Sequence, residues 1–182
     1  MTVPRTEVDP ARFNRDLVLP HELRLQDFQL ALQDVYDFFY DVNSALAGRG
    51  LGRFDDMLRP AAMSGILSDM LTASLAKHSR ALTVNGYFNG HPDLIVAGKY
   101  ANDSVQAGGD GVEVKTTRKR GGAVDNETQP AADRAPMEFI EIYLAHVVPD
   151  DFRRNPRGEL GTRTATLHRQ GIRKLREGWV YR

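Results

Sequence analysis

The sequence has no cysteine among its 182 residues. Disulfide bonds and zinc sites built on thiolates are therefore excluded. The chain also lacks any apolar run as long as a membrane span, and its polar first residues, 1–17, have no apolar core of the kind that a signal peptide needs. We therefore expect a cytoplasmic protein with no membrane partner.

Net charge is absent as well, but the charges are unevenly distributed. Residues 1–114 carry 10 Lys and Arg against 15 Asp and Glu, whereas residues 115–182 carry 14 against 9. A basic C-terminal part favours a polyanionic partner such as nucleic acid, although a solvated charged surface has the same composition.

The length of the chain predicts one domain with a sizeable core. Residues 1–19 are polar and contain two prolines, so we expect a loose N-terminal segment. Residues 20–182 are expected to form a single domain, with an N-terminal helical part at 20–59 and the core at 60–182.

Two helices are predicted in the first half of the chain. From Leu25 to Leu46, apolar residues recur at alternating steps of three and four, which is the heptad spacing of an amphipathic helix. This apolar seam has two interpretations: it packs on the protein's own core, or it also supports a dimer. A second helix is predicted from Pro60 to Ser79, since proline is favourable at a helix start. Together with strands at 81–88, 92–96, 111–117 and 137–148 and a basic helix that Thr166 caps and Gly178 ends, these elements predict an α/β fold of the α+β type.

The stretch 91–120 contains the residues with the clearest chemistry. The strand expected at 111–117 alternates apolar and charged residues, so that Glu113 and Lys115 share one face. If this strand pairs with the one that Asp93 opens, two carboxylates and an ammonium converge. Two carboxylates can hold Mg²⁺, which polarises a phosphate oxygen and lowers the pKa of a bound water.

The pattern Pro92-Asp93 followed by Glu113-x-Lys115, with 19 residues between the two acids, resembles the PD-(D/E)XK nuclease superfamily, the fold of most type II restriction endonucleases. The resemblance implies a restriction-endonuclease-like core, a central mixed β-sheet flanked by helices. It also implies that Asp93 and Glu113 are metal ligands together with the backbone carbonyl of Val114, and that Lys115 is the catalytic lysine.

Two other residues near the motif have alternative interpretations. In the nuclease fold the helix before the catalytic sheet often adds an acidic ligand, and by position Asp69 is the candidate. An exposed helical aspartate is the simpler interpretation. His91 precedes the motif in a turn, where a lone histidine is usually structural or exposed, so we do not include it among the site residues.

The same resemblance implies a Mg²⁺-dependent endonuclease, with Mn²⁺ as a substitute ion, that cuts double-stranded DNA at a specific sequence. Because cutting both strands usually requires two active sites, we expect a homodimer. A DNA methyltransferase acting on the same sequence is a further expected partner. Basic side chains are expected to contact the DNA backbone, namely Arg118, Lys119, Arg120, Arg169 and Arg173.

Other functions are compatible with the same residues. A repair, recombination or phage-defence nuclease would keep the fold and the chemistry. A DNA-binding module would keep the fold without cleavage, which the intact set of two acids and a lysine disfavours. A helical interaction protein built on the seam at 25–46 would leave the convergent charged residues unexplained.

Overall fold

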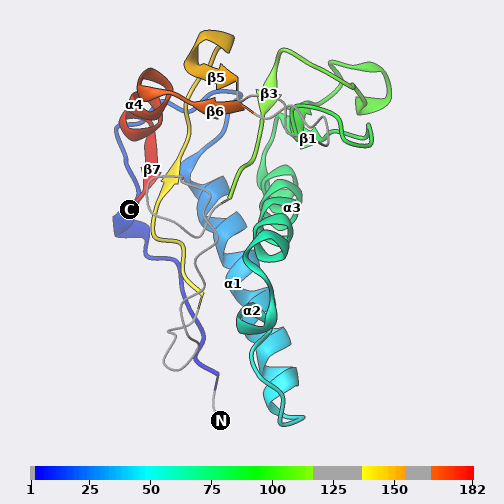
Figure 1. Ribbon diagram of the computed structural model, residues 1–182, viewed down its shortest axis with the longest axis vertical. Coiled ribbons are helices and arrows are strands. Elements are labelled where there is room, and N and C mark those ends of the chain that lie inside the picture. Colours follow the sequence, from blue (N-terminus) through cyan, green and yellow to red (C-terminus); the bar gives the residue numbers. More distant parts are fainter. Residues whose placement is uncertain (1–2, 117–136, 155–164) are drawn as a thin grey trace. The chain divides into compact units, whose positions relative to one another are not determined.

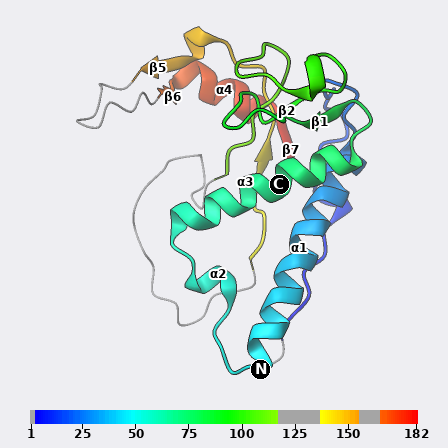
Figure 2. The same ribbon diagram turned by 90° about the vertical axis from the view of Figure 1, so that its right-hand side faces the viewer.

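The computed structural model describes residues 3–116, 137–154 and 165–182 as a mixture of helices and strands, which confirms the predicted combination (Figures 1 and 2). The chain divides into two compact units, one of Met1–Pro10 with Leu19–Phe139 and one of Ala11–Val18 with Ile140–Arg182. The expected single domain over 20–182 stays a prediction. Of the helices described, none combines the length and apolar composition that crossing a membrane requires.

The helices are α1 (Leu25–Ala47), α2 (Phe54–Met57), α3 (Pro60–His78) and α4 (Arg169–Glu177), with short 3₁₀ turns at Pro10–Arg12, Ala101–Asp103 and Pro149–Asp151. The strands are β1 (Leu82–Val84), β2 (Leu94–Val96), β3 (Gly111–Val112), β4 (Ile142–Tyr143), β5 (Phe152–Arg154), β6 (Ala165–Leu167) and β7 (Trp179–Tyr181).

The predicted heptad seam is the buried face of α1. Leu32 and Val35 are fully buried, and Val35 packs with Met63 and Leu67 of α3 in one hydrophobic cluster of the first unit. Figures 1 and 2 show the two helices against each other. Burial of each such aliphatic side chain contributes about 1.5–3 kcal/mol. The centre of the seam therefore serves the protein's own core and is not available as a dimer interface.

A polar contact joins α1 and α3 beside this cluster. Asp34 of α1 accepts hydrogen bonds from Ser74 Oγ (2.5 Å) and Lys77 Nζ (2.9 Å), and it lies 2.9 Å from His78 Nε2. Partial burial acts to raise the pKa of Asp34, but these three neighbours more than offset it and lower the pKa to about 2. The ionised carboxylate thus holds the last turn of α3 against α1.

In the N-terminal segment 1–19, which we expected to be loose, described residues make contacts within each unit. In the first unit Val8 is buried, and its N–H donates to Gln33 Oε1 of α1 (3.1 Å). In the second unit Phe13 packs edge-on against Tyr181, with ring centroids 4.9 Å apart. Two buried apolar side chains are enough to hold a segment whose composition is otherwise polar.

The described residues form three small sheets, and the expected restriction-endonuclease-like core with a central mixed sheet stays a prediction. One sheet has the order β1-β2-β3, and the other two are the pairs β4-β7 and β5-β6. Every pairing between these strands is antiparallel. A strand ends where its backbone finds no further partner, and none of the described strands continues beyond three residues.

The apolar run 137–148 is not the single core strand that we expected. Its start belongs to the first unit, where the Phe139 N–H donates to the Tyr36 hydroxyl (2.9 Å) and the two rings lie 5.7 Å apart. In the second unit only Ile142 and Tyr143 pair, with β7, and the register shifts between them. Apolar composition predicted burial, but division between two units interrupts the strand.

In the second unit the basic helix begins later than predicted. His168, and not Thr166, is the N-cap of α4, with Nδ1 accepting from the Gln170 N–H (3.2 Å). Thr166 instead lies within β6, whose pairing with β5 occupies the backbone there. The buried Asp151 carboxylate accepts from Lys174 Nζ of α4 (2.6 Å), which secures the helix within the unit.

The close approach of β2 and β3 at Gly111 leaves no room for a side chain. Its φ is 154°, and a Cβ added there would lie 2.0 Å from the Leu94 carbonyl oxygen. We expect Gly111→Ala to lower the free energy of unfolding by roughly 2 kcal/mol or more, because the pairing must open. Thermal unfolding followed by circular dichroism measures this. In Gly109→Ala the added Cβ meets nothing within 4 Å; this matched control should change stability by less than about 0.5 kcal/mol. Equal losses in both variants would contradict the expectation.

Candidate metal centre

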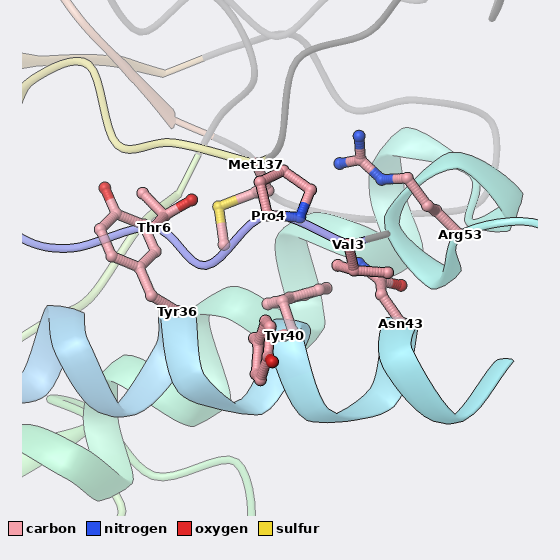
Figure 3. A pocket seen from close by; sticks show the side chains of 9 residues that line it. Val3, Pro4, Thr6, Tyr36, Tyr40, Asn43, Arg53 and Met137 are labelled. Carbon is pink, nitrogen blue, oxygen red and sulfur yellow. The ribbon is translucent and has the colours of Figure 1, made fainter. Parts of the chain in front are cut away.

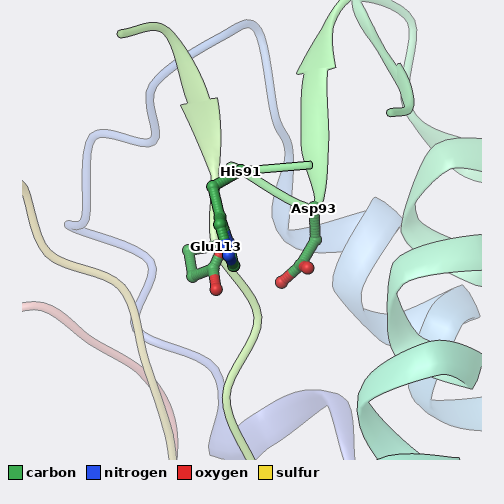
Figure 4. Close-up of side chains that lie close together, drawn as sticks. All are labelled: His91, Asp93 and Glu113. Carbon is green, nitrogen blue, oxygen red and sulfur yellow. The ribbon is translucent and has the colours of Figure 1, made fainter. Parts of the chain in front are cut away.

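The pairing of β2 with β3 brings the charged residues of the motif together. The strands are antiparallel, with Leu94 opposite Val112 and Ile95 opposite Gly111. One step further along the same register, Asp93 lies opposite Glu113. Side chains directly opposite each other in an antiparallel pair point to the same face. Figure 4 shows the two carboxylates at this end of the strands.

The Asp93 carboxylate binds a backbone N–H just beyond the last hydrogen-bonded residue of β3. Its Oδ2 accepts a hydrogen bond from the Val114 N–H at 2.7 Å, although β3 itself ends at Val112. Partial burial is the main effect that raises the pKa of Asp93, and the nearby charge of Glu113 raises it further. The Val114 N–H and Lys115 oppose this shift without cancelling it. The Val114 N–H thus orients the Asp93 side chain, and ionisation of that side chain costs the fold stability.

The two oxygens of Glu113 have different neighbours. Oε1 lies 2.5 Å from Lys115 Nζ, and Oε2 lies 3.2 Å from His91 Nδ1. Partial burial acts to raise the pKa of Glu113, but the hydrogen bonds from Lys115 and His91 outweigh it, so that the pKa is lowered. The two facing carboxyls therefore have pKa values shifted in opposite directions, a pattern often found at functional sites.

The donor set suits a divalent cation. Among the described residues, His91, Asp93 and Glu113 each offer one ligand atom, and these atoms all lie within 4.8 Å of one another. Carboxylate oxygens are ligands for Mg²⁺ and Mn²⁺, and an imidazole nitrogen is a ligand for first-row transition ions. The residues present thus fit the metal that the nuclease resemblance implies.

Neighbouring hydrogen bonds brace the backbone around this group. The buried Asn85 side chain donates to the Pro92 carbonyl (3.0 Å) and the Val105 carbonyl (2.8 Å). On the other side of the site, Thr116 Oγ1 donates to the Ser64 carbonyl of α3 (2.7 Å). Side chains that must hold a ligand in a defined geometry need such support from their surroundings.

The predicted site residues are brought together only in part. Asp93, Glu113 and Lys115 converge, and the Val114 backbone is beside them through its N–H. Asp69 is exposed on α3, and the group formed by the described residues does not include it. Its role as a ligand, like that of the Val114 carbonyl, stays a prediction.

Of the predicted DNA-contacting residues, the structure describes two. Arg118, Lys119 and Arg120 fall outside the described residues. Arg169 and Arg173 are exposed on α4 of the second unit, where Arg173 Nε donates to Glu177 Oε1 (2.7 Å).

Sequence reasoning missed His91. Its position in a turn before a proline suggested an exposed or structural residue, and its side chain is indeed 66% exposed. However, His91 lies outside β2, so no alternation along a strand relates it to Asp93. Its backbone bonds to Gln106 and Gly108 place it there, and no local pattern in the sequence signalled them.

A separate hollow in the first unit is too small to bind an organic substrate. Pro4, Tyr36, Tyr40, Arg53 and Met137 are among its lining residues (Figure 3). Its volume is about 20 Å³, enough for a water molecule. This hollow is therefore not a candidate for a substrate site.

Comparison with known proteins gives no relative for this chain. No protein-family model matches it, and neither a curated protein nor a solved structure does. Its function has to be inferred from the residues of the site.

The opposite pKa shifts predict opposite effects of two neutral substitutions on metal-free protein. The raised pKa of Asp93 means that its ionisation costs stability once the pH rises through that pKa. The lowered pKa of Glu113 means that its ionised form stabilises the fold until the pH falls through that pKa. At pH 7 in EDTA, Asp93→Asn should therefore raise Tm and Glu113→Gln should lower it.

The effect of Asp93→Asn should fade as the pH falls through the raised pKa of Asp93 toward the ordinary range of a free aspartate, whereas the effect of Glu113→Gln should fade only as the pH falls through the lowered pKa of Glu113. Differential scanning calorimetry at pH 7 and at the lowest pH where the wild type remains folded measures both effects. Tm shifts of the same sign at pH 7 would contradict the proposed charge distribution.

Proposed function

We propose that this chain is a divalent-metal-dependent endonuclease that hydrolyses phosphodiester bonds of double-stranded DNA. The single observation that carries the proposal is the convergence of Asp93, Glu113 and Lys115 on one face at the end of the β2–β3 pair. Two carboxylates can hold an ion that assists phosphodiester hydrolysis, and a lysine beside them can offset the charge that develops.

Each residue has a role that follows from its contacts. Asp93 and Glu113 would hold the ion, and the Val114 N–H orients the Asp93 carboxylate toward it. The ion, when bound, acts as a Lewis acid toward a phosphate oxygen and toward the attacking water. Lys115 is 77% exposed while its ammonium lies 2.5 Å from Glu113, so it can reach a phosphate and offset charge that develops there.

The finer assignment is part of the same proposal. The resemblance to the PD-(D/E)XK superfamily suggests a restriction-endonuclease-like core and cleavage at a specific sequence, with Mg²⁺ or Mn²⁺ as the ion. The direct pairing of β2 with β3, the strands that the motif residues flank, supports this assignment. A homodimer would supply two active sites, one for each DNA strand. Because the seam of α1 is largely buried in the core, another surface must form that dimer.

DNA contacts are proposed from charge. Arg169 and Arg173 are exposed on α4, and such side chains neutralise phosphates without reading sequence. The same role is proposed for Arg118, Lys119 and Arg120. A cognate methyltransferase belongs to the restriction form of the proposal, whereas a repair, recombination or phage-defence nuclease would not need one.

The second candidate is a DNA-binding module that does not cleave. The exposed basic helix α4 would serve it as well as it serves a nuclease. The raised pKa of Asp93 disfavours it, because a binding module gains nothing from a carboxylate whose ionisation costs stability. A helical interaction protein is less favoured still, since its proposed surface on α1 is the interior of the first unit.

The decisive experiment is cleavage of supercoiled plasmid and phage DNA by purified protein in Mg²⁺, in Mn²⁺ or in EDTA. We expect discrete fragments with either ion and none in EDTA. Asp93→Asn and Lys115→Ala should each lower the rate by about 10²–10³-fold, the usual cost of removing one group that stabilises developing charge. Sequencing the fragment ends would identify the recognised sequence.

Lys77→Ala is the matched control, since Lys77 is also an exposed lysine in an ion pair but its partner is Asp34. It should cleave at the wild-type rate. Cleavage that survives both site substitutions would overturn the proposal. Salt-sensitive DNA binding without any cleavage would favour the binding module, and a random smear would remove the claim of sequence specificity.

A further inference from the structure

His91 stands beside the two carboxylates, although the motif does not include it. Its Nδ1 lies 3.2 Å from Glu113 Oε2, and one ligand atom from each of His91, Asp93 and Glu113 falls within a 4.8 Å group. Figure 4 shows the imidazole next to the Glu113 carboxylate, with the Asp93 carboxylate directed toward both.

The spacing of these atoms fits the coordination sphere of a small divalent ion. With bonds of about 2.1 Å in an octahedral site, neighbouring ligand atoms lie about 3.0 Å apart and opposite ones about 4.2 Å apart. The 3.2 Å between His91 Nδ1 and Glu113 Oε2 matches neighbouring positions. The 4.8 Å limit on the whole group exceeds the distance between opposite positions by about 0.6 Å, which is the closure that binding an ion would require.

The backbone of His91 is held on both sides. Its N–H donates to the Gln106 carbonyl (3.0 Å), and its carbonyl accepts from the Gly108 N–H (2.7 Å). A bridge to Ala107 accompanies these bonds. The exposed imidazole is therefore carried by a defined backbone position and not by a free turn.

One oxygen of Glu113 and the Nδ1 of His91 would both face the same ion once the imidazole proton is on Nε2. Lys115 lies against Oε1, whereas Oε2 is the oxygen near His91. A carboxylate from Asp93, a carboxylate from Glu113 and a neutral imidazole would balance the charge of a divalent cation. These three ligands differ from an all-oxygen site because one of them, His91, offers a nitrogen.

That nitrogen changes which ion the site prefers. Mg²⁺ is a hard ion that takes oxygen ligands, whereas imidazole is a ligand for Mn²⁺, Co²⁺, Ni²⁺ and Zn²⁺. We propose that His91 is the third metal ligand, through Nδ1, and that the site binds first-row transition ions more tightly than Mg²⁺. This inference rests on the proposed metal site of Asp93 and Glu113, and it names the ion class and a ligand that the motif does not specify.

Metal binding without DNA tests the inference independently of activity. Mn²⁺ titration followed by electron paramagnetic resonance gives its affinity, and competition gives that of Mg²⁺. We expect wild-type protein to bind Mn²⁺ at least about tenfold more tightly than Mg²⁺. Pulsed measurements on protein with ¹⁵N-labelled histidine should show one nitrogen coupled directly to bound Mn²⁺.

Two substitutions separate the ligand role from a structural one. His91→Ala should lower Mn²⁺ affinity by about tenfold or more. Loss of a residue that only supports a metal ligand already costs about tenfold in affinity, and loss of a ligand should cost at least as much. His91→Asn keeps a polar group near the Nδ1 position and should retain Mg²⁺ binding within about threefold while losing the nitrogen coupling and most of the preference for Mn²⁺. His146→Ala removes an exposed histidine of the second unit and should change nothing.

Asp93→Asn distinguishes failure of the inference from failure of the proposed function. If it abolishes binding of both ions while wild-type Mn²⁺ shows no nitrogen coupling, the carboxylate site stands and His91 is not a ligand. If Asp93→Asn leaves both affinities unchanged, or if wild-type protein binds neither ion, the metal site itself is wrong and the proposed function fails with it. An unchanged preference for Mn²⁺ in His91→Asn would also overturn the inference.

Discussion

The register of β2 against β3 is the constraint on which the candidate site depends. Leu94 opposite Val112 implies Asp93 opposite Glu113, and a slip of one residue would send the two carboxylates to different faces. Leu94 is fully buried and Val112 nearly so, and Gly111 admits the Leu94 carbonyl at a distance that no side chain would allow. Core packing therefore sets the register, and the register sets the chemistry.

Three buried acids are each paired with a cation, whereas the half-buried Asp93 faces a second acid. Asp27 pairs with Arg24, Asp55 with Arg53, and Asp151 with Lys174. In these pairs a cation compensates the loss of hydration, and each pair secures a helix or a turn. The three acids therefore have structural roles.

Asp93 is different because it faces a second carboxylate, and burial together with that neighbour raises its pKa. A fold that tolerates such a group gives up some stability at neutral pH, which is the cost that the proposed cation site would carry. The buried Asn85 and the contact of Thr116 with α3 supply the rigidity that the group needs.

The sequence by itself determined α1 and α3 nearly to their observed ends. Apolar spacing of three and four and a proline at a helix start are local signals, and neither depends on a distant partner. It also predicted that Asp93, Glu113 and Lys115 lie close together, because the alternation of side chains along an extended chain is local as well. Antiparallel pairing of β2 with β3, which burial of Leu94 and Val112 favours, then brings these residues together.

Only the tertiary structure decided how far each strand extends, how the run 137–148 divides between two units, and that His91 joins the carboxylates. A strand lasts as long as its partner does, and the position of His91 depends on bonds to Gln106 and Gly108, more than ten residues away in the chain. Such contacts are not encoded in the periodicity of any one segment. Local pattern can therefore predict which side chains share a face, whereas the set that meets at one point follows from the pairing of distant segments.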